Sequence, residues 1–260
     1  MNSCLEWRVA NTDLTTAVQW ASRRVQTSVD RRDMPLRSII QKLDDKIMGD
    51  VATQAFMGYL AATGRFTVCY EEIRNDRSKY IDPGWDVLAG ATEEQFMSLT
   101  SNSAAVLSPE LVTFSIKSSR VPPGYTLEKC MERLDFKILK YGSDIGFDLK
   151  ADFEVQMYFD NGTQPPEGLN ESDLDRLLCS ARQDMKAAEE LASLMQATRF
   201  SKAYLCKYIS RAALIRRWRR CDQEGLPPVQ KMRIGSTTKE IWTAKLVWGK
   251  SFKAVQKCTI

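Results

Sequence analysis

The chain has 260 residues, of which 43% are hydrophobic and 27% are charged, a composition that excludes a disordered or fibrous protein. It contains no histidine, which excludes an imidazole general base, an imidazole-activated Ser or Cys nucleophile and a histidine-ligated zinc. The formal net charge is +4, and any chemistry must rest on carboxylates, on lysine or on a bound hard cation.

Helical and strand patterns alternate in the first two thirds of the chain. Apolar residues at helical spacing predict helices over residues 13–29, 35–47 and 50–62. Short β-branched and aromatic runs predict strands over 66–73, 85–89 and 112–116, and the polar stretch 91–102 is expected to be an excursion from the sheet or a short helix. Another helix is predicted over 127–138 and a further strand over 153–159. The predicted order is helix, strand, strand, strand, helix, strand.

The last third is predicted to be mainly helical. A helix capped by Asn170 or Ser172 is expected to reach residue 191, and a second helical run covers 202–220. The apolar runs 241–242 and 246–248 predict one or two strands in the tail. We therefore expect an α+β protein with N-terminal helices over 1–45, a core over 46–168 and a basic helical region with a tail over 169–260.

Three pieces of the predicted core carry residues suited to phosphodiester chemistry. Asp50 and Gln54 lie on a predicted helix, and Asp86 opens the second predicted strand in the run Asp-Pro-Gly-Trp-Asp. The third predicted strand contains Ser115 and Lys117 in the run Phe-Ser-Ile-Lys-Ser-Ser. Together with the order of elements, these pieces resemble the PD-(D/E)XK superfamily of restriction-endonuclease-like nucleases over about residues 46–160.

The resemblance implies a Mg²⁺- or Mn²⁺-dependent endonuclease that acts on DNA in preference to RNA. Asp86 would be the central metal ligand, Asp50 or Gln54 would hold the helix position, and Lys117 would be the lysine of the motif. Hard divalent cations prefer oxygen ligands and make a bound water more acidic. A nearby lysine can orient or deprotonate that water and offset charge in the transition state.

Two positions depart from the family pattern. Ser115 stands where the family has an acid two residues before the lysine, and Gln54 stands where many relatives have Glu. Either another acid supplies the missing ligand, or the site is inactive and the protein is a nuclease-like, nucleic-acid-binding subunit. The candidates for a migrated acid are Glu71, Glu72 and Asp76.

A second D-x-K sequence occurs at Asp148-Leu149-Lys150, with Asp135 or Asp144 as its upstream acid. Residues 142–146 are typical of a loop and not of the approach to a buried strand, so this motif is the weaker candidate. The simpler interpretation of both motifs is a turn before a strand and an exposed lysine at a strand end, because motifs this short also occur by chance.

Positive charge is concentrated at the C-terminal end. Residues 199–260 contain fifteen Lys or Arg against three acids, a net charge of +12, which leaves −8 of the total +4 on residues 1–198. The predicted helix over 202–220 has an apolar side and a basic side, and phosphates are the natural partners of clustered lysine and arginine. The candidate nucleic-acid-binding residues are Lys207, Arg211, Arg216, Arg217, Arg219 and Arg220.

Three alternatives to nucleic-acid binding remain for this basic helix. Its charges can pair with the acidic body, it can lie on an anionic membrane surface, or it can dock on an acidic protein partner as part of an adaptor. No run of about 20 apolar residues is present, and the first residues lack the order of a signal peptide, so we expect a cytoplasmic protein. Seven cysteines without a C-x-x-C pair favour buried free thiols, and the sequence is compatible with a homodimer or larger complex.

Overall fold

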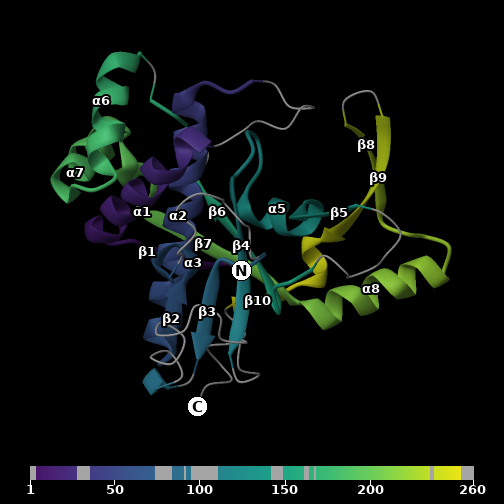
Figure 1. Ribbon diagram of the computed structural model, residues 1–260. Coiled ribbons are helices and arrows are strands. Elements are labelled where there is room, and N and C mark those ends of the chain that lie inside the picture. Colours follow the sequence, from purple (N-terminus) through teal and green to yellow (C-terminus); the bar gives the residue numbers. More distant parts are fainter. Residues whose placement is uncertain are drawn as a thin grey trace.

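The computed structural model describes residues 4–27, 36–73, 84–90, 92–94, 111–141, 149–160, 164–166, 168–234 and 237–252 (Figure 1). A large mixed sheet has a layer of helices on one face, and a smaller sheet with two further helices lies on the other side. The α+β class predicted from the sequence is confirmed.

The main sheet has the strand order β1-β7-β6-β4-β3-β2, with the short β10 also paired to β7. Strands β4 and β6 run parallel, and the other strand pairs described in this sheet are antiparallel. A parallel pair needs a long crossover, which here carries the helix α5 (Leu127–Arg133) and the strand β5 (Asp135–Tyr141). The strands are β1 (Leu5–Arg8), β2 (Phe66–Cys69), β3 (Val87–Gly90), β4 (Val112–Arg120), β6 (Phe153–Phe159), β7 (Lys202–Ser210) and β10 (Lys250–Ser251).

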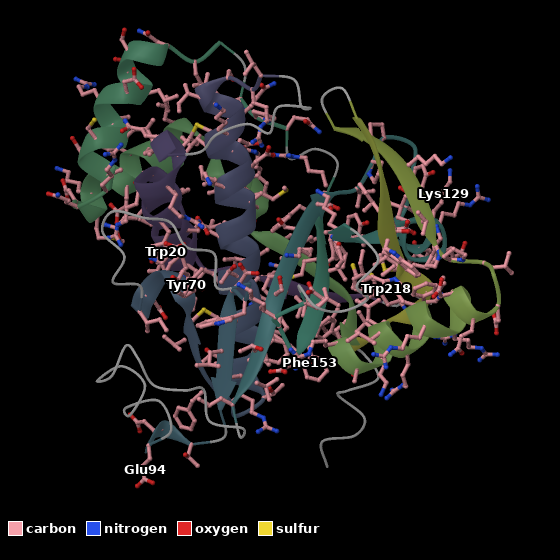
Figure 2. All side chains as sticks on the ribbon, turned by 45° about the vertical axis from the view of Figure 1, so that its right-hand side comes forward. Trp20, Tyr70, Glu94, Lys129, Phe153 and Trp218 are labelled. Carbon is pink, nitrogen blue, oxygen red and sulfur yellow. The ribbon has the colours of Figure 1, made fainter. Side chains whose placement is uncertain are left out.

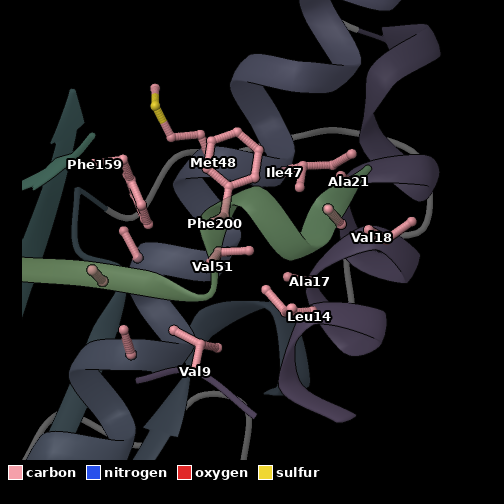
Figure 3. Close-up of a cluster of buried hydrophobic side chains, with 14 of the residues drawn as sticks. Val9, Leu14, Ala17, Val18, Ala21, Ile47, Met48, Val51, Phe159 and Phe200 are labelled. Atoms are coloured by element: carbon pink, nitrogen blue, oxygen red, sulfur yellow. The ribbon is translucent and has the colours of Figure 1, made fainter. Parts of the chain in front are cut away.

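Helices cover one face of this sheet and bury the larger core with it. The elements of this layer are α1 (Asn11–Arg24), η1 (Val25–Thr27), α2 (Ile39–Ala62), α6 (Glu171–Ala181), α7 (Met185–Leu194) and η2 (Ala197–Phe200). Figure 3 shows Val18 of α1, Ile47 and Val51 of α2, and Phe200 meeting in this core. The start of α2 is fixed by side chains, because Ser38 forms a capping box with Gln41 there.

The opposite side carries a smaller sheet of order β5-β9-β8, built from β8 (Val229–Ile234) and β9 (Thr237–Lys245) together with β5. Helix α8 (Arg211–Gln223) and the short η3 (Leu246–Trp248) pack beside it. Trp218 of α8 is fully buried and donates its Nε1–H to the Thr243 carbonyl at 2.8 Å, which fixes α8 against β9 (Figure 2).

Three boundaries predicted in the first two thirds of the chain were wrong. Residues 39–62 form the single helix α2, since buried positions continue at a spacing of four across Gly49. The predicted helix over 127–138 ends at Arg133, because residues 135–141 extend as β5 and pair with β9. The predicted strand over 66–73 also ends early, at Cys69, and Tyr70–Ile73 form the short helix α3.

Two predictions in the last third were also wrong. The helix expected up to residue 191 is divided into α6 and α7, because Asp184 caps a new helix start at Met185. Residues 202–210 of the expected helix 202–220 form the strand β7. Positions 203–206 are buried on both faces of the sheet, and such a continuous apolar run cannot be told from a helix by its spacing. Strand β7 pairs with β6, so residues from the basic third of the chain belong to the main sheet.

None of the helices in the described part of the chain combines the length and apolar content needed to cross a membrane. The six described cysteines are free, and Cys4, Cys69, Cys130 and Cys206 are buried, in agreement with the expected buried thiols.

Candidate functional site: a buried acid pair beside a basic helix

Asp86 is held against β4 by its main chain and by its side chain. Its N–H donates to the Phe114 carbonyl at 2.8 Å, and its Oδ2 accepts from the Ile116 N–H at 2.6 Å. These two bonds bracket Ser115, so the Asp86 carboxylate lies next to that residue. The short β3 begins directly afterwards at Val87, which is fully buried and fixes the position of the turn.

Ser115 and Lys117 lie on the face of β4 that points away from α2. Their neighbour Phe114 packs on Phe56 of α2 with ring centroids 5.0 Å apart, and alternate residues of a strand point to opposite faces. The parallel register pairs Ser115 with Glu154 of β6. Ser115, Lys117 and Glu154 therefore share one face, on the side of the smaller sheet.

Glu154 is the acid that the sequence analysis missed. Its side chain is 5% exposed, and its Oε2 has no hydrogen-bond partner among the described residues. Burial raises the pKa of Glu154 to about 7; Lys117 and a hydrogen bond from Ser115 oppose this rise, and the negative charge of Asp86 adds to it. Strand β4 thus has Ser115 and not an acid two residues before Lys117. Glu154 of the neighbouring strand β6 lies beside Ser115.

A signal for Glu154 exists in the sequence. The strand Phe153–Phe159 was predicted with its correct bounds, and glutamate is rarely fully buried without a partner or a task. The motif places its acid two residues before the lysine on the same strand, whereas Glu154 reaches Ser115 through strand pairing from 39 positions further along the chain. We define Asp86, Ser115, Lys117 and Glu154 as the acid-pair site.

The residues predicted for the helix position lie in a different cluster. Asp50 of α2 is buried and forms an ion pair with Arg24, whose other nitrogen lies 3.1 Å from Glu71. Burial raises the pKa of Asp50 to about 6, more strongly than Arg24 lowers it. The charges acting on Asp50 are those of Arg24, Glu71 and Lys46, and those acting on Glu154 are Lys117 and Asp86. The structure therefore brings Asp86, Ser115 and Lys117 together and groups Asp50 with other residues; Gln54 follows one turn later on α2.

Two of the three acids proposed to supply the missing ligand have other contacts in the structure. Glu71 belongs to the Arg24 cluster, and Glu72 accepts from the Cys69 N–H at 3.1 Å. Asp76 lies outside the described residues, as do Asp148 and Asp144 of the second D-x-K motif. Among the described residues, no group of three or more Asp, Glu, His or Cys side chains is arranged to hold a metal ion.

A rigid frame borders the acid-pair site on the same face. Asp152, two residues before Glu154, accepts from the Thr113 N–H at 3.0 Å and from its hydroxyl at 2.8 Å. Arg211, the first residue of α8, donates its main-chain N–H to the Asp152 carbonyl at 2.8 Å. The first residue of α8 is therefore bonded to Asp152, two residues before Glu154 in the chain. Figure 2 shows Phe153 beside this first turn of α8.

Helix α8 presents its arginines to solvent. Leu214 and Trp218, four residues apart, form its buried side, and Ser210 caps its start by accepting from Ala213 N–H at 3.3 Å. The exposed side borders a hollow of about 860 Å³. Its lining includes Arg216, Arg217, Arg219, Arg220, Ile209 and Trp248.

The hollow and the acid-pair site are neighbours in the sheet. Ile209, which lines the hollow, is the cross-strand partner of Glu154. Five of the six predicted basic residues lie on α8, and the sixth, Lys207, lies on β7 opposite Gln156. The prediction that Lys207 lies on a helix was therefore wrong. Its strand β7 pairs with β6, which carries Glu154.

The chain was compared with family models, with curated proteins and with solved structures. Nothing matches.

Proposed function

We propose that this protein hydrolyses phosphodiester bonds of nucleic acid in a metal-dependent reaction at the acid-pair site. The observation that carries the proposal is the meeting of Asp86, Glu154 and Lys117 around Ser115. The sheet order β2-β3-β4-β6, preceded by α2 and with β4 and β6 parallel, supports a restriction-endonuclease-like core. DNA is proposed as the substrate in preference to RNA on the resemblance to that superfamily.

The residues of the site suit a hard divalent cation such as Mg²⁺ or Mn²⁺. Mg²⁺ is commonly held by one or two carboxylates, with water and substrate phosphate as the other ligands, and Asp86 with Glu154 offers this donor set. The Glu154 Oε2 atom, buried and without a hydrogen-bond partner among the described residues, is a suitable ligand. When bound, the cation would polarise the phosphate and acidify a water molecule.

The chain's own groups have separate tasks in this proposal. The pKa of Glu154, raised by burial to about 7, allows its carboxyl to hold or release a proton near neutral pH. Lys117 lies close enough to Glu154 to act on its charge, and its ammonium would offset negative charge on the phosphate. Ser115 hydrogen-bonds to Glu154 and orients that carboxylate.

Helix α8 would bind the phosphates that flank the cleaved bond. Its exposed arginines border a hollow that reaches Ile209, the strand neighbour of Glu154, so one nucleic-acid strand can contact both. Arginine forks match pairs of phosphate oxygens, and phosphate binding by such groups releases counterions.

The second candidate function is a nucleic-acid-binding subunit without activity. It is favoured by the small number of acids, because Asp50 lies in the Arg24 cluster, and Asp86 and Glu154 are the only acids placed at the site among the residues that the structure describes. The basic hollow requires neither acid and would bind phosphates in both cases.

The two functions separate in one experiment. Purified protein is incubated with labelled single- and double-stranded DNA and RNA, with Mn²⁺ or with EDTA, and both cleavage and gel shift are scored. Nuclease activity predicts Mn²⁺-dependent cutting that Asp86→Ala abolishes and that Asp175→Ala, an exposed acid of α6, leaves unchanged. A gel shift without cutting in any condition supports the binding subunit and contradicts the nuclease.

A further inference from the structure

Lys150 lies over the turn that leads to Asp86. A Cβ atom placed on Gly84 would lie 2.7 Å from the Lys150 Cδ and 2.8 Å from its Cβ, distances at which atoms overlap. Gly84 also has a φ of +80°, which disfavours other residues. Glycine is therefore required here for two reasons, and one of them is the close passage of the lysine stem.

The main chain at Lys150 is tied to the start of α8. Arg211 donates from its Nη1 to the carbonyls of Leu149 and Lys150 at 3.3 and 3.5 Å. Its Nη2 lies 3.6 Å from the Asp152 carboxylate, which the Thr113 bonds hold in place. This network joins β4, β6 and α8 and fixes the backbone from which the Lys150 side chain extends.

The Lys150 ammonium has no counter-ion in the described part of the chain. Lys150 is exposed, and no described acid forms an ion pair with it. Its stem crosses Gly84, and Gly84 lies two residues before Asp86 of the acid-pair site. A lysine placed in this way is suited to bind an incoming anion that also contacts the acids of that site through a cation.

We propose that Lys150 binds a phosphate of nucleic acid at the border of the acid-pair site, with Arg211 as the positioning residue that holds its backbone. The proposal deepens the proposed function and rests on it for the nature of the ligand. It assigns Lys150 to a phosphate next to the cleaved bond, whereas the four arginines of the α8 hollow bind phosphates further away. The acid-pair site would then be approached from the side where Gly84 and Arg211 lie.

The test is equilibrium binding of a fluorescein-labelled DNA oligonucleotide in EDTA, measured by anisotropy over a salt series. Lys150→Met, which keeps the stem and removes the charge, is expected to weaken binding about tenfold and to lower the slope of log K against log salt by about 0.9. Lys150→Arg is expected to restore both values. The control Lys186→Met, at an exposed lysine of α7, is expected to change neither.

Gly84→Ala supplies a second test, because the added methyl group displaces the Lys150 stem. It should weaken binding in the wild-type background and have no further effect on binding in Lys150→Met. The proposal is overturned if wild-type protein binds no DNA, if Lys150→Met binds like wild type, or if Lys186→Met causes the same loss. Binding that depends on Lys150 without any Mn²⁺-dependent cutting supports the phosphate position and contradicts only the nuclease.

Discussion

The buried Glu154 makes stability depend on pH in a direction opposite to that of an ordinary salt-bridged carboxylate. Its folded-state pKa is about 7, against 4.5 for the unperturbed group, because burial disfavours the charged form. The protonated form is therefore favoured in the folded state. Glu154 carries no penalty below pH 4.5, and its cost to folding grows as the pH rises towards 7 and is constant above that.

The size of this cost follows from the two pKa values. One pKa unit corresponds to 1.36 kcal/mol, so ionised Glu154 costs about 3 kcal/mol above pH 7. Glu154→Gln has no such titration. Its free energy of unfolding relative to wild type should rise by about 3 kcal/mol between pH 4.5 and pH 8, equivalent to a relative increase in Tm of roughly 6 °C or more for a chain of this size.

The assay is thermal and urea unfolding of wild type and Glu154→Gln in EDTA at a series of pH values. Asp50, whose pKa is also raised, is present in both proteins, so its contribution cancels in the difference. Adding Mg²⁺ above pH 7 should stabilise wild type more than Glu154→Gln, since the variant loses one of the two carboxylates of the acid-pair site. A difference in stability that is the same at pH 4.5 and pH 8 would refute the description of Glu154 as a buried acid.

Two further predictions concern the buried ion pairs and the basic helix. Asp44 is fully buried between Arg120 and Arg199, and Asp44→Asn should lower the free energy of unfolding by about 3–5 kcal/mol, because two largely buried arginines each lose a carboxylate partner. The control Asp45→Asn, at a 40% exposed carboxylate, should cost less than about 1 kcal/mol in the same urea titration, and equal losses would contradict the burial. Replacing all four arginines of the α8 hollow by alanine should weaken binding to duplex DNA. It should also lower the slope of log K against log salt by about 0.9 for each phosphate contact removed, with an unchanged circular dichroism spectrum. Unaltered binding would contradict the assignment of the hollow to phosphate binding. The four are Arg216, Arg217, Arg219 and Arg220.

Local patterns predicted much of the fold because several segments agree with their tertiary setting. The strand Phe153–Phe159 has the predicted bounds, and α2 includes all of the predicted helix over 50–62 and most of the one over 35–47. Strand β7 was predicted as a helix because its residues are buried on both faces, which removes the alternation that identifies a strand. The end of α5 was missed because the pairing of β5 with β9 depends on residues about 100 positions away.

The candidate site was predictable to the extent that it is local. Asp86 lies directly before β3, which pairs antiparallel with the strand that carries Ser115 and Lys117, and such neighbours can be anticipated from consecutive predicted strands. Glu154 was missed because a parallel pairing, which requires the intervening crossover, places it next to Ser115. Asp50 was assigned to this site from a motif position alone, because its pairing with Arg24 joins two helices and has no local sequence signal.

The most direct test of the central claim is to compare Glu154→Gln with Asp50→Asn in Mn²⁺-dependent cleavage of labelled DNA, after thermal melts have confirmed that both variants are folded. If Glu154 supplies the acid that β4 lacks, Glu154→Gln should lose activity about a hundredfold or more while Asp50→Asn retains most of it. Full activity in Glu154→Gln, or a loss confined to Asp50→Asn, would contradict the assignment of the site to the β4–β6 pair.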